Sequence, residues 1–154
     1  ISSIGAFSMN VLGAMGDAAV GFYDCFHTVP YMDIPQNKTF MAAWQKAYPG
    51  EMIDEFGIMG FDVGVCLVKA LDAVGGDPTN TEGLVSVLHK IEYESPRGKI
   101  RMGPNNGTIV PMYARKVVKK EREFRHEATF LGFFGTPCGP QYEWGECKLG
   151  CPST

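Results

Sequence analysis

The sequence has no apolar run of the roughly 20 residues that a membrane-spanning helix needs, and it has no excess of positive charge. Lysine and arginine number 14 against 17 acidic residues, so the net charge of −3 gives no reason to expect nucleic acid as a partner. The basic residues between Arg115 and Arg122 alternate with valine and glutamate. They predict a solvated strand end or hairpin, with a phosphate or nucleic-acid patch as the weaker alternative.

A signal peptide is also missing, because the opening ISSIGAFSMN has neither a basic start nor a proper hydrophobic stretch. The chain begins at Ile1 without an initiator methionine, as a piece cut from a longer protein would. The missing signal therefore says little about the compartment in which the protein works.

Recognisable catalytic motifs are absent. His27, His89 and His126 have no aspartate, glutamate or cysteine at catalytic or metal-binding spacing. The Gly-Lys pair in SPRGK lacks the other residues of a phosphate-binding loop, and GDAAVG precedes a predicted strand where a dinucleotide fingerprint would follow one. No serine lies in a nucleophile-elbow context. We therefore expect neither an enzyme nor a bound cofactor or metal.

Cysteine is scarce outside the C-terminal tail. Cys25 and Cys66 lie in apolar segments, where a free cysteine packs as a small hydrophobic residue. The remaining three crowd the tail, as Cys138, Cys147 and Cys151. One disulfide among them is the favoured hypothesis, and it would imply an oxidising compartment. Zinc is a weaker alternative because C-x8-C-x3-C is not a familiar ligand spacing, and free thiols are the third possibility.

The residues that are present indicate a folded α/β protein. An apolar content of 45% and an aromatic content of 12% are enough for a packed core. Strands are predicted at residues 21–30, 99–102 and 108–120, and helices at residues 38–48, 56–74 and 79–91. After residue 120 we expect a polar connection and then an apolar piece. This order predicts helices that cover at least one face of a sheet.

The segment DEFGIMGFDVGVCLVKALDAVGGDP contains the most apolar of these helices. Apolar residues keep helical spacing from Phe56 to Val74, and few charges occur before Lys69, so we expect other structure to cover most of this helix. Asp54 and Glu55 precede it. Two acids at a helix start usually complement the helix dipole, although they could also perform acid–base chemistry. The next helix is predicted to open on a Thr79–Glu82 capping box.

Four stretches in one order resemble a known family. They are MGDAAVGFY, PYMDIPQNKTFMAAWQKAYPG, FGIMGFDVGVCLVKALDAVGG and PRGKIRM. Together they resemble the C-terminal part of the type I periplasmic-binding-protein family, the extracellular receptors of ABC transporters of the branched-chain amino-acid type. The resemblance covers about residues 1–120, and the cysteine-rich tail has no counterpart in it. In the third stretch, Phe61-Asp62 matches the family's Tyr-Asp pair, so we expect Asp62 to be structural.

This resemblance implies part of a two-lobed α/β fold, with three-layer αβα lobes joined by hinge crossings. The implied division is residues 1–26 as the end of the second lobe, 27–30 as a hinge crossing, 31–101 as part of the first lobe, 102–120 as the return crossing and a strand of the second lobe, and 121–154 as a C-terminal extension. Neither lobe would be complete. A separate chain carrying the N-terminal half, or an exchange between copies of this chain, would have to supply the rest.

The resemblance also implies a solute site in the cleft between the lobes. Phe56 takes the place of an aromatic residue that contacts the solute, although it could equally be an ordinary core residue. The loop from residue 2 to residue 8 would hold the solute's charged end through hydroxyls and backbone amides. Ile4 stands nearest the place where some members have an acid for an ammonium group. Glu55 or Asp54 could substitute, or the ligand could belong to another class such as aromatic acids, amides or urea-like molecules. The candidate ligand-binding residues are Ser3, Gly5, Phe7, Glu55 and Phe56.

The resulting expectation is a periplasmic or extracellular receptor that binds a small polar molecule, an amino acid or a similar carboxylate or amide, and delivers it to an ABC-transporter permease. The full-length protein would be secreted, with a lipid anchor as an option. Two alternatives stay open. A receptor ectodomain of the same fold is suggested by sequons at Asn37 and Asn106, and a small α/β enzyme would use Asp54 or Glu55 with His27.

Overall fold

The computed structural model describes residues 7–104, 106–120 and 123–134. Its elements are α1 (Met9–Met15), the 3-10 helix η1 (Gly16–Ala19), β1 (Tyr23–Phe26), α2 (Pro35–Ala47), α3 (Glu55–Ala73), α4 (Thr81–Leu88), β2 (Glu92–Ser95), β3 (Gly98–Met102), β4 (Thr108–Lys120) and β5 (Glu123–Phe134). The α/β class expected from the order of the predicted elements is confirmed.

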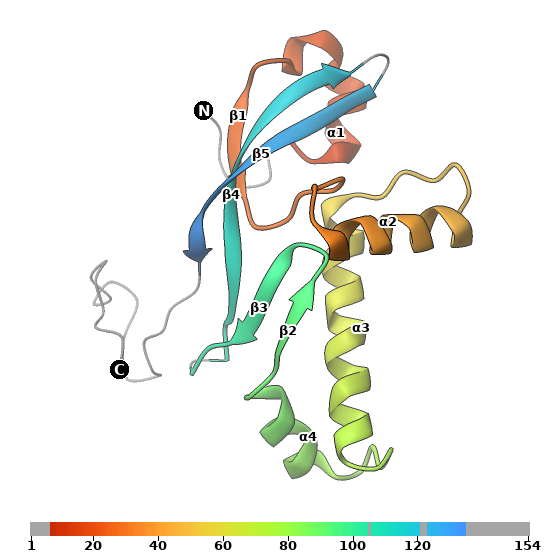
Figure 1. Cartoon of the computed structure of the whole chain (residues 1–154), viewed down its shortest axis with the longest axis vertical. Helices are drawn as coiled ribbons and strands as arrows, with labels where there is room; N and C mark the ends of the chain where they lie inside the picture. The colour runs from red at the N-terminus through yellow and green to blue at the C-terminus, as the bar shows by residue number, and fades with distance from the viewer. Residues whose placement is uncertain (1–6, 105, 121–122, 135–154) are drawn as a thin grey trace.

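Strand β4 joins two units that Figure 1 shows one above the other. Its first residues pair with β3, as Arg101 opposite Ile109, and its later residues pair with β1, as Tyr23 opposite Lys116. β5 runs antiparallel along nearly all of β4. We call α1, η1, β1, β5 and residues 110–120 of β4 the terminal unit. We call α2, α3, α4, β2 and β3 the middle unit.

Each unit has its own cluster of buried apolar side chains. The terminal cluster is Phe7, Met9, Leu12, Ala19 and Val117. The middle cluster is Phe40, Met41, Ile53 and Ile58. Tyr31 packs against both clusters, and its backbone has a positive φ of 62°, a conformation that few residues other than glycine adopt. The two cores therefore meet at the connection that follows β1.

Two helix starts differ from the sequence-based expectation. α2 begins at Pro35, which was expected to break the chain, because proline fits the first turn of a helix, where its missing N–H is not needed. The prediction of a Thr79–Glu82 capping box is also wrong. Asn80 caps α4 through a hydrogen bond of 3.0 Å from the Gly83 N–H, while the Thr79 backbone and hydroxyl donate to Asp77.

Two strands were missed. β2 forms between the predicted helix at residues 79–91 and the predicted strand at residues 99–102, where no strand was predicted. β5 begins where a polar connection was expected, so His126 is a buried strand residue. The prediction of a solvated basic run is correct for Lys119 and Lys120, which are exposed, and wrong for Arg115, which is fully buried. Arg115 is buried because it pairs with Asp24 and Glu55, which are distant in the sequence.

Within the described residues, α3 is less covered than its sequence predicts. Its apolar side chains remain exposed on two sides of the helix, with Phe61 and Val68 on one side and Val63 and Leu67 on the other. Figure 1 shows α2 at the start of α3, β2 beside the helix and α4 at its far end. A helix with this composition normally lies inside a larger structure, so the exposed apolar side chains of α3 form an interface whose partner is not among the described residues.

The turn between β2 and β3 depends on Gly98. Its φ is +104°, and an added Cβ would lie 3.0 Å from both the Pro111 ring and the Tyr113 hydroxyl. We expect Gly98→Ala to lower the free energy of unfolding by about 1–3 kcal/mol, because alanine is strained at this positive φ and its Cβ would crowd Pro111 and Tyr113. Urea denaturation would measure this change. Gly64→Ala is the control, since Gly64 is helical with open space around it and should gain stability; equal effects of the two substitutions would contradict the prediction.

Candidate functional site

The start of α3 lies where the two units meet. Asp54 caps the helix, and its carboxylate accepts a hydrogen bond of 2.8 Å from the Gly57 N–H, as expected for an acid at this place. The other oxygen of Asp54 accepts a hydrogen bond from the Asn10 side chain in α1. Phe56 is 61% exposed, so the interpretation of Phe56 as an ordinary core residue is not supported.

Glu55 is the opposite of Phe56, because it is completely buried. One of its carboxylate oxygens accepts a hydrogen bond of 2.7 Å from Nη1 of Arg115, and the other accepts one of 3.1 Å from the backbone N–H of Met9. Arg115 also donates to both carboxylate oxygens of Asp24 and to the backbone carbonyl of Thr28. A single buried cation on β4 thus holds one acid from each unit.

His126 completes this buried group from β5. Its Nδ1 lies 4.0 Å from the carboxylate of Glu55, and neither ring nitrogen has a hydrogen-bond partner within the described residues. The pKa of His126 is lowered to about 4. Burial of the ring is the larger cause, and the positive charge of the Arg115 guanidinium is the second. The imidazole is therefore neutral at pH 7, and Arg115 supplies the positive charge of the group.

The remaining predicted site residues are placed as follows. Phe7 is buried in the terminal cluster and stacks on Phe22, with ring centroids 5.2 Å apart. Ser3 and Gly5 lie outside the described residues, as do the three tail cysteines. The structure thus brings Phe7, Glu55 and Phe56 to the junction of the units, two of them buried and one exposed.

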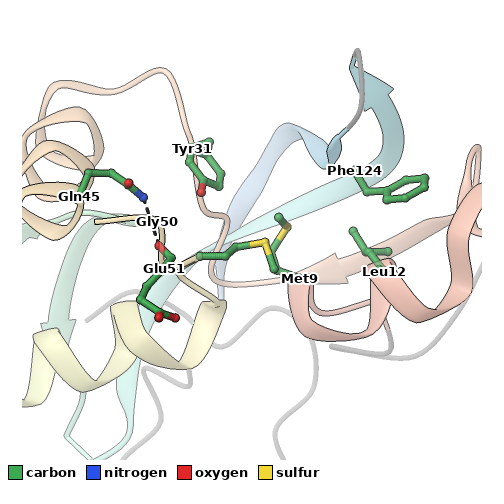
Figure 2. A pocket seen from close by; sticks show the side chains of 9 residues that line it. Met9, Leu12, Tyr31, Gln45, Gly50, Glu51 and Phe124 are labelled. Atoms are coloured by element: carbon green, nitrogen blue, oxygen red, sulfur yellow. Dashed lines mark hydrogen bonds between the residues drawn. The ribbon is translucent and has the colours of Figure 1, made fainter. Parts of the chain in front are cut away.

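A pocket of about 450 Å³ lies at the same junction (Figure 2). Its lining is Met9, Leu12, Gly13, Tyr31, Gln45, Gly50, Glu51, Met52 and Phe124. α1 and β5 supply one wall, and the end of α2 with the following loop supplies the other. The loop is held in place by its Glu51 carbonyl, which accepts hydrogen bonds from the Gln45 amide and the Trp44 indole.

Sequence reasoning missed this pocket, and none of the five predicted ligand-binding residues lines it. The partial helical spacing of Met9 and Leu12 was the only local signal. Met9 connects the pocket with the predicted residues, because its side chain lines the pocket and its N–H donates to Glu55.

A second buried group lies inside the middle unit. Asp62 pairs with Arg97 at 2.6 Å and accepts hydrogen bonds from the hydroxyls of Tyr93 and Ser95, which confirms its structural role. Arg97 also donates to Nδ1 of His27 at 2.8 Å. Burial and the Arg97 charge lower the pKa of His27. His27 therefore has an arginine as its partner, while Asp54 and Glu55 have other partners, so the enzyme alternative finds no assembled acid–base pair.

Among the described residues, no cluster of histidine, cysteine and acidic side chains could hold a metal ion. Within the same ranges, no helix combines the length and the apolar character needed to cross a membrane. Cys25 and Cys66 are both free thiols.

Comparison with known proteins gives the family. A family model described as "Periplasmic binding protein" matches residues 1–122. The chain belongs to the periplasmic binding protein family. It is 29% identical over 112 residues to Leu/Ile/Val-binding protein homolog 6 of Brucella abortus, and the alignment covers 71% of this chain and 28% of that relative. The chain thus spans less than a third of the length of the curated relatives it matches.

Solved structures of the family share its fold. The substrate-binding protein of an ABC transporter from Sphaerobacter thermophilus has a TM-score of 0.79 and 23% identity, over 84% of this chain and 36% of that one. A solute-binding protein from Rhodopseudomonas palustris BisB5 in complex with 3,4-dihydroxybenzoic acid has a TM-score of 0.73 and 27% identity, over 86% and 36% of the two chains. The resemblance to the type I family, and the two-lobed fold that it implies, are thereby confirmed.

Proposed function

We propose that this periplasmic binding protein chain is the C-terminal portion of a solute receptor for an ABC importer. The observation that carries the proposal is the exposed Phe56 at the start of α3, where the two units meet, because a molecule bound between the units could bury its ring. The proposed place of work is the periplasm or the cell exterior. A membrane permease is the proposed partner for delivery of the solute.

In this proposal the two units correspond to the two lobes. Residues 1–26 end the second lobe, residues 27–30 cross to the first lobe, and residues 31–101 form part of it. Residues 102–120 return to the second lobe. The pairing of β4 with β1 and β5 in one unit, and with β3 in the other, supports this division.

The rest of the receptor would come from an N-terminal half, present in the same longer protein or as a separate chain. The exposed apolar side chains of α3 support this proposal, since Val63, Leu67 and Val68 are ones that further structure of the first lobe would cover. The chain also covers only 36% of the solved relative from Sphaerobacter thermophilus. A fragment of a receptor explains both observations.

For the solute we propose a small molecule with an apolar body and polar ends. Phe56 would stack on the apolar part, and the loop with Ser3 and Gly5 would bind a polar end. Glu55 and Phe7 would belong to the site as the buried residues beneath these contacts. Relatives support two classes: one Rhodopseudomonas palustris structure is in complex with 4-hydroxybenzoate, and another is named a branched-chain amino acid transporter. Aromatic carboxylates and branched-chain amino acids are therefore the first ligands to test.

The test is the variant Phe56→Ala in the receptor that contains both halves. We expect solute affinity to fall more than tenfold without unfolding, because an exposed ring that is buried by a ligand contributes about 1.5–3 kcal/mol. Isothermal titration calorimetry with leucine and with 4-hydroxybenzoate would measure the change. The control is Val85→Ala, an equally simple truncation on α4.

Two results would count against these proposals. Unchanged affinity of Phe56→Ala would remove Phe56 from the site. Failure of the assembled receptor to bind any amino acid or aromatic acid in such a panel would overturn the proposed function itself.

The alternative of a receptor ectodomain was suggested by two glycosylation sequons, and one of them is inaccessible in the fold. Asn37 is fully buried, and its Nδ2 donates hydrogen bonds to the carbonyls of Val29 and Pro96 at 3.3 and 2.9 Å. A glycan on this nitrogen would require both bonds to break. Asn106 is exposed, so only that sequon is accessible in the fold.

A further inference from the structure

The two walls of the pocket are connected through one side chain. Met9 and Leu12 in α1 form the first wall, and the loop from Gly50 to Met52 forms the second (Figure 2). That loop leads directly into α3, whose first residue is Glu55. The carboxylate of Glu55 accepts the N–H of Met9, the first residue of α1, so it joins the starts of the two helices behind the pocket.

The other oxygen of Glu55 is anchored to the sheet of the terminal unit. Arg115 donates to it at 2.7 Å, and the side chains of both residues have no exposed surface. Asp24 fixes the opposite side of the guanidinium, with Nε donating to its carboxylate at 2.7 Å. A charge pair removed from water has few alternative geometries, because any displacement leaves a buried charge without its partner.

We propose that Glu55 is a positioning residue for the pocket, whose carboxylate sets the separation and relative orientation of the two walls. A rotation of the middle unit against the terminal unit would have to distort or break this contact, in addition to the pairing of β3 with β4 and the hydrogen bond from the Tyr113 hydroxyl to the Arg97 carbonyl. The exposed hydrogen bond between Asn10 and Asp54 lies beside it, where water competes for both partners. This inference depends on the contacts at the junction and holds for whatever molecule the pocket takes.

The structure offers a matched control. Asp62 is also a buried helical acid in α3, paired at 2.6 Å with a buried arginine, and its direct partners Arg97, Tyr93 and Ser95 all lie in residues 93–97. The bonds that Arg97 makes outside the middle unit, to His27 and from the Tyr113 hydroxyl, do not use the Asp62 carboxylate. Loss of the Asp62 charge should destabilise that unit without changing how the two units are oriented. A purely structural role for Glu55 would give the same result.

The test compares Glu55→Gln with Asp62→Asn by residual dipolar couplings of the backbone amides, in the whole chain of 16.9 kDa. In the parent protein and in Asp62→Asn we expect one alignment tensor to fit the couplings of both units. In Glu55→Gln we expect two different tensors, because glutamine keeps a hydrogen-bond acceptor for Met9 but loses the charge that binds Arg115.

A second variant keeps the test decisive if Glu55→Gln does not fold. Glu55→Asp retains the charge but is shorter by one methylene, so it cannot reach Arg115 and Met9 together, and it should also give two tensors. A single tensor with the parent orientation in either folded variant would overturn the inference. Two tensors in Asp62→Asn would overturn it as well, because the orientation would then follow stability in general.

Discussion

Replacing Arg115 with methionine will lower the free energy of unfolding by about 3–5 kcal/mol, the cost of leaving buried charges without their partner. Arg115 has no exposed side-chain surface and holds the carboxylates of Asp24 and Glu55, which are equally buried. Methionine fills a similar volume but donates no hydrogen bond. Urea denaturation followed by circular dichroism would measure the loss, and Arg101→Ala, an exposed site on β3, should change stability by less than about 0.5 kcal/mol.

Two further variants separate charge from packing at this position. Arg115→Lys should lose less stability, since it keeps a positive charge but not the paired hydrogen bonds to Asp24. Combining Arg115→Met with Asp24→Asn and Glu55→Gln should recover part of the loss, because no unpaired charge then remains. A loss below about 1 kcal/mol in Arg115→Met would show that the buried group is not held by its charges.

Lowering the pH from 7 to 4 will destabilise the protein through His126 by up to about 3 kcal/mol, at about 1.4 kcal/mol for each unit of pKa shift. Burial first, and then the charge of Arg115 on β4, lower the pKa of His126 to about 4 from the ordinary value of 6.5, although Asp24 on β1 acts in the opposite direction. Between these two pH values the unfolded chain binds a proton that the folded protein does not. The stability is therefore fully present above pH 6.5 and is lost as the pH falls toward 4.

The measurement is the free energy of unfolding as a function of pH for the parent protein and for His126→Phe. We expect the difference between the two curves to shrink between pH 6.5 and pH 4, because phenylalanine cannot take up the proton. His89→Gln, at the exposed end of α4, is the control and should leave the parent's pH dependence unchanged. Parallel curves for the parent and His126→Phe would show that His126 is accessible to protons in the folded state.

The elements that the sequence predicts well are those whose signals are local. The apolar spacing of α3, the strand around Cys25 and the long β-branched run of β4 were all recognised, because residues close in sequence carry their patterns. β5 was not recognised, since its first half is polar in sequence and only its pairing with β4 shows it to be a strand. Arg115 was placed on the surface for the same reason: its partners Asp24 and Glu55 are 91 and 60 residues away.

The candidate site was likewise predicted only in part. The resemblance to known receptors pointed to the start of α3, and the structure has an exposed Phe56 there and a buried Glu55 next to it. The pocket could not be predicted, because its walls come from four separate parts of the chain around Leu12, Tyr31, Gly50 and Phe124. No local pattern records that these segments meet.

The way in which β4 joins both ends of the chain also determines an order of folding. The terminal cluster needs Val117 to cover Phe7 and Leu12, and β1 finds its partner only when residues 113–116 are present. The middle unit, by contrast, takes its apolar cluster and its Asp62–Arg97 pair from residues 35–102. Within the described residues, assembly of the terminal unit therefore depends on the middle unit, which lies between β1 and β4 in the sequence and must let these two strands meet.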